Sequence, residues 1–149
     1  MFVHRRTVRI EWGDCDPANI VYYPRYFEIF DQSTNELFAA AGFPKKATLQ
    51  RFGMVGWPMV DTRAKFYVPS TFDDEIEIES RVAAWRRSSF EILHRVFKGE
   101  VLAVEGFETR VFVGPHPDDP KRLKSVPVPE AIKARFAGEG NLISGPSTD

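Results

Sequence analysis

One long amphipathic helix is the strongest pattern in this chain of 149 residues. After Pro24, aromatic and aliphatic residues recur at steps of mostly three, four and seven, which is the spacing of one helical face. Pro24 suits the first helical position, because the amide that it lacks would have no partner there anyway. Gly42 suits the position directly after the helix, where a glycine often ends it. We therefore predict a helix over residues 24–41. Its aromatic residues lie nearly all round it, so the surface that covers it must curve.

Strand patterns occupy most of the remaining chain. Residues 3–12 alternate between apolar and polar side chains, which indicates a half-buried strand. Further extended segments are expected at residues 54–60, 62–68, 75–85, 88–99 and 101–114, with a hairpin turn at residues 98–100. A short helix is expected within residues 127–138. One helix followed by consecutive strands predicts an α+β fold, with the helix on one face of an antiparallel sheet.

Composition and charge exclude several classes of function. The hydrophobic share of 43% is typical of a globular chain, and the net charge of −1 argues against nucleic acid as a partner. A single cysteine allows no intrachain disulfide, and His4, His94 and His116 lack the spacing of metal ligands, so we expect no metal site. Because no apolar run approaches a membrane span or a secretory signal, we expect a cytoplasmic protein without a membrane partner.

The segment GDCDPANIVYYP, residues 13–24, places two carboxylates directly before the helix. A helix start carries unpaired amides and partial positive charge, so it can stabilise an oxyanion, and a carboxylate beside it can attack a carbonyl or activate water. Asp-Pro is also ordinary turn chemistry, so Asp14 or Asp16 could simply cap the turn or the helix. The residues alone leave both interpretations open. Cys15 lies between acids that disfavour a thiolate, and we interpret it as a small packed residue.

The segment EWGDCDPANIVYYPRYFEIFD resembles the signature of the 4-hydroxybenzoyl-CoA thioesterase family of hotdog-fold enzymes. MVGWPMV, AAWRRSSF and TRVFVG with KRLKSVPVP resemble that family in the same order, and the similarity spans residues 7–130. The resemblance implies a hotdog fold over residues 1–137, with one central helix wrapped by a curved antiparallel sheet of five or six strands. Residues 138–149 are expected to be a flexible tail. The resemblance also implies dimers with continuous sheets, often tetramers, and active sites at the subunit interface.

The resemblance also assigns roles to residues. Asp16 would be the nucleophile or the base, the backbone N–H of Tyr23 would polarise the thioester carbonyl, and Asp14 would be structural. The candidates for the acyl pocket are Tyr22, Phe27, Asp31 and Trp57. The candidates for binding the nucleotide of coenzyme A are Arg86, Arg87, Ser89, Arg122 and Lys124. Plainer alternatives remain, because a tryptophan is usually a core residue and an arginine pair usually lies in a solvated turn.

Together these inferences predict an enzyme that hydrolyses an aromatic, hydroxybenzoyl-like acyl-CoA to the free acid and CoA, in the degradation of aromatic compounds. No cofactor is expected, because CoA is part of the substrate. One alternative is a short-chain aliphatic acyl-CoA thioesterase that uses the same acid. The other is a non-catalytic acyl-CoA binding module, which would have no need of Asp16.

Overall fold

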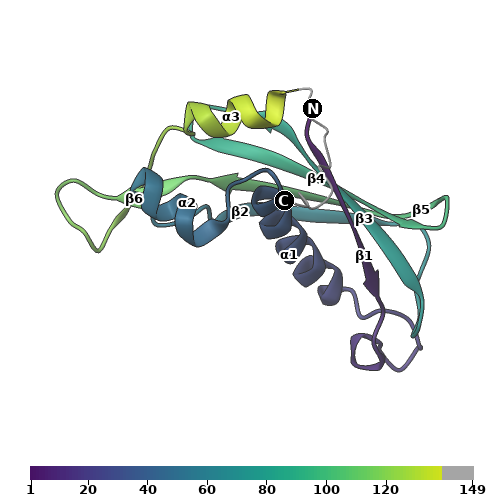
Figure 1. The fold of residues 1–149 in the computed structure, drawn as a ribbon. Helices are drawn as coiled ribbons and strands as arrows, with labels where there is room; N and C mark the ends of the chain where they lie inside the picture. Colours follow the sequence, from purple (N-terminus) through teal and green to yellow (C-terminus); the bar gives the residue numbers. More distant parts are fainter. Residues whose placement is uncertain (139–149) are drawn as a thin grey trace.

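A curved antiparallel sheet of five strands forms the body of the computed structural model, which describes residues 1–138. Its order is β1-β3-β4-β5-β2, and the strands are Val3–Arg9 (β1), Met59–Phe66 (β2), Glu75–Trp85 (β3), Ser89–Lys98 (β4) and Val101–Val111 (β5). The sheet curves around the helix Pro24–Ala40 (α1), and β1 and β2 remain as separate edges, so it is not a closed barrel (Figure 1). This confirms the α+β fold with one long helix in the curve of an antiparallel sheet.

Smaller elements gather at the end of the sheet where α1 ends (Figure 1). They are the helices Lys45–Phe52 (α2) and Glu130–Ala137 (α3) and the two-stranded ladder of Val113–Pro115 (β6) with Leu123–Ser125 (β7). A 3-10 turn, Trp12–Asp14 (η1), follows β1. No helix among residues 1–138 combines the length and the apolar character needed to cross a membrane. The tail expected at residues 138–149 lies, apart from Gly138, outside the described residues.

Most predicted elements are present within two or three residues of their expected ends. The helix expected at 24–41 and the strand expected at 75–85 are confirmed, and Gly99 has the positive φ of 60° that a tight hairpin turn requires. The short helix expected near the C-terminus is α3. The extended segment expected at 54–60 joins the sheet only from Met59, where β2 begins, and before that it forms an isolated bridge between Gly56 and Val113. Helix α2 was missed, since its eight residues carry no clear apolar stripe.

The core is divided into two apolar clusters along α1. The cluster beside the C-terminal half of α1 is rich in aromatic rings, and Phe38 packs there against Trp57 and Phe136, each at 5.0 Å between ring centroids. The cluster beside the N-terminal half contains Tyr26 and Phe30. Polar side chains are buried between the two clusters. The fold therefore fixes α1 over its whole length and leaves its first residues at the end of the molecule that carries the acidic loop.

Gly106 on β5 allows α1 to approach the sheet closely. A Cβ atom at this position would lie 2.4 Å from Cε2 of Phe30, which is closer than two carbon atoms can approach. The Phe30 ring uses this space to stack on the imidazole of His94, with 4.9 Å between ring centroids. The glycine is therefore required by packing and not by a turn.

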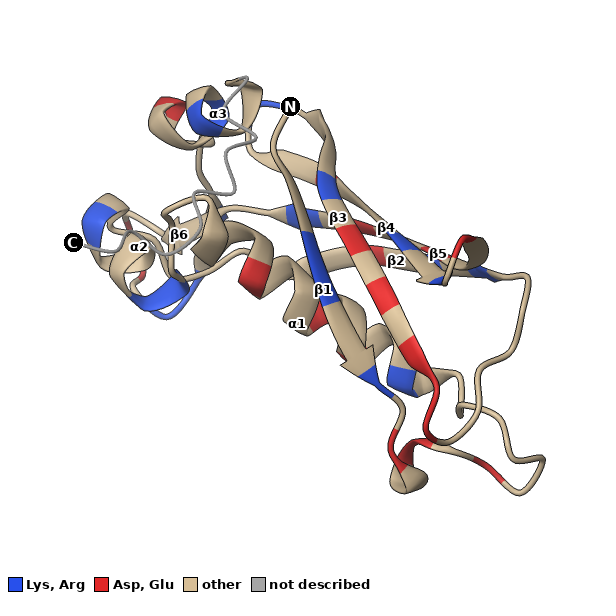
Figure 2. Ribbon diagram, turned by 45° about the vertical axis from the view of Figure 1, so that its right-hand side comes forward, with Lys and Arg blue, Asp and Glu red and all other residues tan. Residues whose placement is uncertain are grey.

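Complementary charges run along the outer residues of β1 and β3. In Figure 2 basic residues are seen along β1 and acidic residues along β3. Arg5 of β1 donates to Glu79 of β3 at 2.8 Å, and Arg9 pairs with Asp73 at 2.6 Å, just before β3 begins. Strand β2 forms the opposite edge of the sheet. Among the described residues it pairs only with β5, and it exposes the large apolar side chains Val60 and Phe66.

Candidate active site

The acidic loop folds back on itself as a small hairpin directly before α1. The amide of Tyr22 donates to the carbonyl of Asp14 at 2.7 Å, and the amide of Asp16 donates to the carbonyl of Ile20 at 2.9 Å. Asn19 occupies the turn with a positive φ of 65°, a conformation that asparagine tolerates better than most residues. Asp16 therefore stands at the turn of the hairpin, and the chain leads from there to the first residue of the helix within eight positions.

The two carboxylates of this loop have different surroundings. One oxygen of Asp14 accepts a bond from the amide of Glu11 at 2.9 Å, and the other lies 3.9 Å from the guanidinium of Arg25, so Asp14 caps the turn η1. Asp16 accepts a bond from the amide of Ala18 at 2.8 Å on Oδ1. No donor within residues 1–138 reaches its second oxygen. Asp16 is half-buried and thus presents one unpaired carboxylate oxygen at the loop.

The start of α1 leaves one particular amide without a partner. Pro24 has no N–H, while the amides of Arg25 and Tyr26 donate to the carbonyls of Tyr22 and Tyr23 at 2.9 and 3.1 Å. The amide of Tyr23 meets no acceptor in the described part of the chain. It lies at the positive end of a helix of 17 residues, where a developing negative charge is stabilised. An unpaired amide at this position can donate to an oxyanion that forms on a carbonyl carbon.

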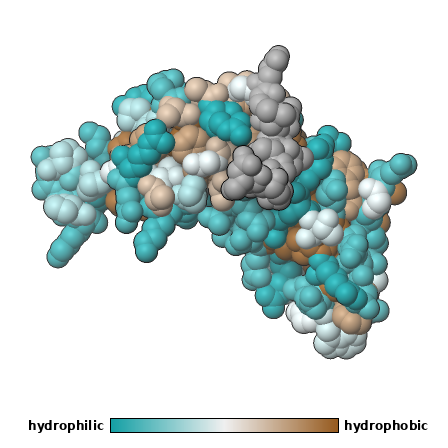
Figure 3. Space-filling view, in the orientation of Figure 1, coloured by the Kyte–Doolittle hydropathy of each residue, from teal (hydrophilic) through white to brown (hydrophobic). Residues whose placement is uncertain are grey.

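An apolar hollow of about 330 Å³ opens beside Tyr23. It lies between the start of α1 and the segment that follows β2, and its lining residues are Ile20, Val21, Tyr23, Tyr26, Phe66, Tyr67, Val68, Pro69 and Ser70. Figure 3 shows apolar surface among hydrophilic side chains on this part of the molecule. The amide of Asp16 is bonded to Ile20, so the free carboxylate oxygen belongs to the loop that walls the hollow. An apolar acyl group can therefore lie beside Tyr23, at the end of the loop that carries the acid.

The four acyl-pocket candidates do not meet in one pocket of a single chain. Tyr22 is exposed next to Tyr23, with 5.5 Å between ring centroids, and Phe27 packs half-buried against the N-terminal cluster. Trp57 is 2% exposed and lies in the aromatic cluster, where its ring stacks on Phe38. Asp31 is exposed near the middle of α1. Of the residues predicted for chemistry or acyl binding, only Tyr23 lines the hollow.

The candidates for binding coenzyme A lie together at the other end of the sheet. The amide of Val128 donates to the carbonyl of Arg87 at 2.8 Å, which ties the segment after β7 to the turn between β3 and β4. Arg86 is exposed and pairs with Glu91 at 3.1 Å, and Arg122 and Lys124 are exposed on the β6–β7 hairpin. The acidic loop adjoins the start of β3, and an 11-residue strand is about 35 Å long. Within a single chain, these cations are thus separated from Asp16 by roughly the length of the sheet.

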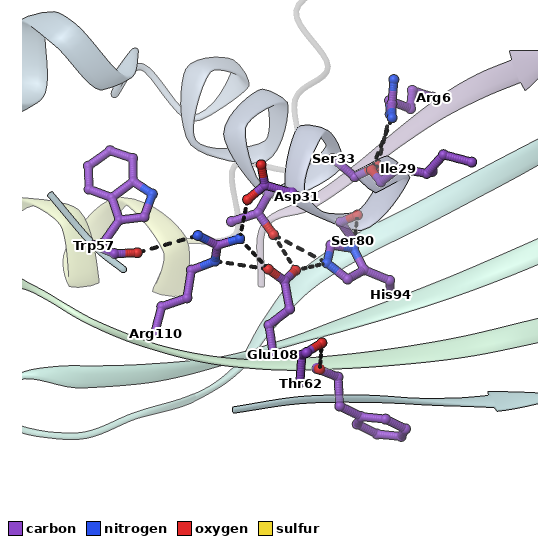
Figure 4. A network of polar contacts seen from close by, with 12 residues as sticks. Arg6, Ile29, Asp31, Ser33, Trp57, Thr62, Ser80, His94, Glu108 and Arg110 are labelled. Carbon is purple, nitrogen blue, oxygen red and sulfur yellow. Dashed lines mark hydrogen bonds and ion pairs between the residues drawn. The ribbon is translucent and has the colours of Figure 1, made fainter. Parts of the chain in front are cut away.

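A buried polar network crosses the middle of the core. It was not predicted from the sequence. Glu108 binds His94, Thr34 and Arg110, and the Nδ1 atom of His94 lies 2.7 Å from the Ser80 hydroxyl (Figure 4). Burial alone would raise the pKa of Glu108, but the bonds from His94 and the charge of Arg110 outweigh it and hold this pKa below its ordinary value. Glu108 is therefore an anion inside the protein.

A signal for this network did exist in the sequence. The even-numbered residues of β4 and β5 face α1, and His94, Glu108 and Arg110 occupy that register in place of apolar side chains. Among the residues that the structure describes, no group of three or more histidine, cysteine, aspartate or glutamate side chains could hold a metal ion. Cys15 packs half-buried against the N-terminal cluster.

Comparisons with known proteins identify the family and the fold of this chain. A family model described as the thioesterase-like superfamily matches residues 10–136. The 4-hydroxybenzoyl-CoA thioesterase of Pseudomonas sp. (strain CBS-3) is 38% identical over 127 residues, which are 81% of this chain and 88% of that enzyme. A solved structure of that enzyme aligns with a TM-score of 0.81 at 33% identity, covering 91% of this chain and 99% of the other.

A second solved structure, a gentisyl-coenzyme A thioesterase, aligns with a TM-score of 0.76 at 26% identity and covers 91% of this chain and 100% of the other. The Acyl-CoA thioester hydrolase YbgC of Escherichia coli O157:H7 is 24% identical over 132 residues, which are 89% of this chain and 94% of that protein. The chain therefore belongs to the thioesterase-like superfamily, and it is a thioester hydrolase with the hotdog fold.

Proposed function

We propose that this acyl-CoA thioesterase hydrolyses an aromatic, hydroxybenzoyl-like acyl-CoA, with Asp16 and the amide of Tyr23 as its catalytic groups. The observation that carries the proposal is the combination, within residues 16–26, of an unpaired carboxylate oxygen on Asp16, an unpaired helix-start amide on Tyr23 and an apolar hollow that Tyr23 lines. The names of two relatives, a 4-hydroxybenzoyl-CoA thioesterase and a gentisyl-coenzyme A thioesterase, support an aromatic acyl group.

The chemistry follows from these groups. The Tyr23 N–H donates to the thioester carbonyl oxygen and stabilises the negative charge that forms there when the carbon is attacked. Asp16 either attacks that carbon itself, which gives a mixed anhydride that water then cleaves, or takes a proton from an attacking water. The C–S bond breaks and releases CoA as a thiolate, a good leaving group that needs no strong general acid. Label in Asp16 after a single turnover in ¹⁸O-labelled water would demonstrate direct attack, with water cleaving the anhydride at the aspartyl carbon, because an activated water that attacks the thioester puts the label only in the released acid.

The site is proposed to be completed by a second copy of the chain. Strand β2 is an edge that pairs only with β5 within the described chain, and an unpaired edge favours pairing with another strand. If two copies join antiparallel about the middle of β2, Phe66 of one copy lies opposite Met59 of the other. Phe66 lines the hollow, whereas Met59 pairs with Arg110, whose guanidinium holds Asp31. The hollow of one copy would then face Asp31 of the other.

The same arrangement accounts for the distant basic residues. The cations at Arg86, Arg87, Arg122 and Lys124 lie too far from Asp16 of their own chain to hold the nucleotide of the same substrate. We propose that they bind the phosphates of a CoA ester whose acyl group occupies the hollow of a neighbouring copy. A guanidinium can bind two phosphate oxygens at once, so Arg86 and Arg87 are the stronger pair.

A panel of CoA esters tests the proposed function. The purified protein is assayed with benzoyl-, 4-hydroxybenzoyl- and 2,5-dihydroxybenzoyl-CoA and with acetyl-, butyryl- and octanoyl-CoA, by release of the free thiol. We expect kcat/KM to be at least tenfold higher for one of the aromatic esters than for any aliphatic one. A preference for an aliphatic ester would refute the aromatic assignment. Tight binding of the esters without hydrolysis would indicate a binding module.

A further inference from the structure

The buried network between the two apolar clusters is a complete set of hydrogen bonds around one carboxylate. Oε1 of Glu108 accepts from Nε of Arg110 at 2.9 Å, and Oε2 accepts from the Thr34 hydroxyl at 2.6 Å and contacts Nε2 of His94. The side chain of Glu108 is completely buried. A carboxylate that is saturated in this way cannot turn without breaking several bonds, so its position is fixed.

Arg110 connects this interior to the surface. Its guanidinium binds Glu108 on one side, and its Nη2 donates to Oδ1 of Asp31 at 2.6 Å on the other (Figure 4). The side chain of Arg110 is 6% exposed, whereas that of Asp31 is 66% exposed. A carbonyl contact with Trp57 at 3.4 Å adds a third partner. Asp31 is therefore a surface carboxylate whose anchor is a buried and immobile cation.

Stability alone does not explain this arrangement. A buried ion pair usually adds little compared with well-packed apolar residues of the same size, since both charges lose their hydration. An exposed aspartate without such an anchor would sample several rotamers. The chain instead holds one oxygen of Asp31 in place and leaves the rest of the carboxylate accessible. What the network supplies is thus a fixed and solvent-accessible hydrogen-bond acceptor near the middle of α1.

We propose that Arg110 and Glu108 are positioning residues for substrate recognition, which set the Asp31 carboxylate so that it accepts a hydrogen bond from a hydroxyl on the acyl group. The inference rests on the proposed function, because it places that acyl group in the hollow of the paired copy. Neither Arg110 nor Glu108 touches the substrate, and both act through Asp31. The network therefore governs discrimination between hydroxylated and unsubstituted acyl groups and leaves the attack on the thioester unaffected.

The experiment compares kcat/KM for 4-hydroxybenzoyl-CoA and benzoyl-CoA in the wild type and in variants. Asp31→Asn is expected to reduce the preference for the hydroxylated ester about tenfold, the effect of one hydrogen bond to a charged group. The double variant Glu108→Gln/Arg110→Met removes both buried charges and leaves neither unpaired, so it is expected to fold. It should lower the preference to the same extent and keep the kcat for benzoyl-CoA within about threefold. Adding Asp31→Asn to it should change nothing further, because the residues act in series.

A matched control separates positioning from a general loosening of α1. Arg6 also anchors the helix, donating to the Ser33 hydroxyl at 2.9 Å and to the carbonyl of Ile29 at 3.1 Å, but it has no contact with Asp31 (Figure 4). Arg6→Met should lower stability and leave the preference between the two esters unchanged. If the double variant does not fold, Arg110→Lys provides the same comparison, because one ammonium cannot bridge both carboxylates as the guanidinium does.

The outcomes distinguish this inference from the proposed function. A wild type that hydrolyses aromatic esters but does not prefer the hydroxylated one refutes the inference alone. The same holds if the folded double variant keeps the full preference, or if its effect adds to that of Asp31→Asn. A wild type without activity on aromatic esters refutes both.

Discussion

Replacing Asp16 with asparagine tests the proposed chemistry without disturbing the loop. The bond from the Ala18 amide to Oδ1 of Asp16, at 2.8 Å, can be kept, because the side-chain oxygen of asparagine accepts the same bond. The unpaired second oxygen becomes an NH₂ group, which can neither attack a carbonyl nor take a proton. We therefore expect a change in folding stability of no more than about 0.5 kcal/mol, the range of a surface substitution without lost contacts.

The expected effect on catalysis is much larger. Loss of a group that acts only in the transition state costs about a thousandfold in kcat, or about 4 kcal/mol in the activation barrier. The assay is the kcat for the preferred CoA ester, followed by thiol release, with thermal unfolding of the same samples to show that the variant is folded. An alanine at this position would also lose the turn bond and about 1 kcal/mol of stability, so asparagine is the better test.

Asp14 provides the matched control for this experiment. It lies two residues away in the same loop and accepts a bond from the Glu11 amide at 2.9 Å, which an asparagine can also accept. Asp14→Asn makes the same chemical change and should keep kcat within about threefold. A folded Asp16→Asn variant with activity within a few-fold of the wild type would refute the assignment, and so would an equal loss in Asp14→Asn.

Further predictions concern packing, substrate binding and pH. Gly106→Ala should lower the free energy of unfolding by at least about 1–3 kcal/mol in urea titrations, because the new Cβ would lie 2.4 Å from the Phe30 ring; an unchanged midpoint would contradict this contact. Arg86→Ala and Arg87→Ala should each raise KM for CoA esters about fivefold with little change in kcat, and an unchanged KM would remove them from the site. The pKa of Glu108 is lowered in the folded state, so the unfolded chain takes up a proton first and this carboxylate's contribution to stability is lost as pH falls below the ordinary glutamate pKa. Unfolding titrations from pH 7 to pH 3 should therefore show the stability difference between the wild type and Glu108→Gln shrinking toward acid pH, and a difference that does not depend on pH would contradict this.

Local chemistry explains what the sequence could predict. The helix over residues 24–41, the strand over residues 75–85 and the acidic loop each depend on neighbours within a few positions, and each is found in the structure. Helix α2 was missed because eight residues with a weak apolar stripe give a periodicity signal too short to recognise. The extended segment near Gly56 resembles a strand, but it forms only an isolated bridge to Val113 before β2 begins.

The buried network could not be assembled from the sequence because its members are far apart in the chain. Thr34 and Glu108 are separated by 74 positions, and Asp31 and Arg110 by 79. Period-two alternation places Glu108 and Arg110 on the inner face of β5, yet it does not say which partners meet them there. The separation of the basic residues from Asp16 has the same origin, since it depends on the direction of β3 relative to α1.

The free amide of Tyr23 depends on how α1 is held elsewhere along its length. Pro24 supplies no donor, and the next two amides turn back to the carbonyls of Tyr22 and Tyr23, so the Tyr23 amide is left unpaired by the local sequence. Its direction is set by the helix axis, and that axis is fixed farther along by the aromatic cluster around Phe38. A helix is stiff over this length, so a change in the cluster should tilt the amide as well as lower stability. Phe38→Leu should then reduce kcat more than it raises KM, whereas a purely structural cluster would leave the kcat of the folded fraction unchanged.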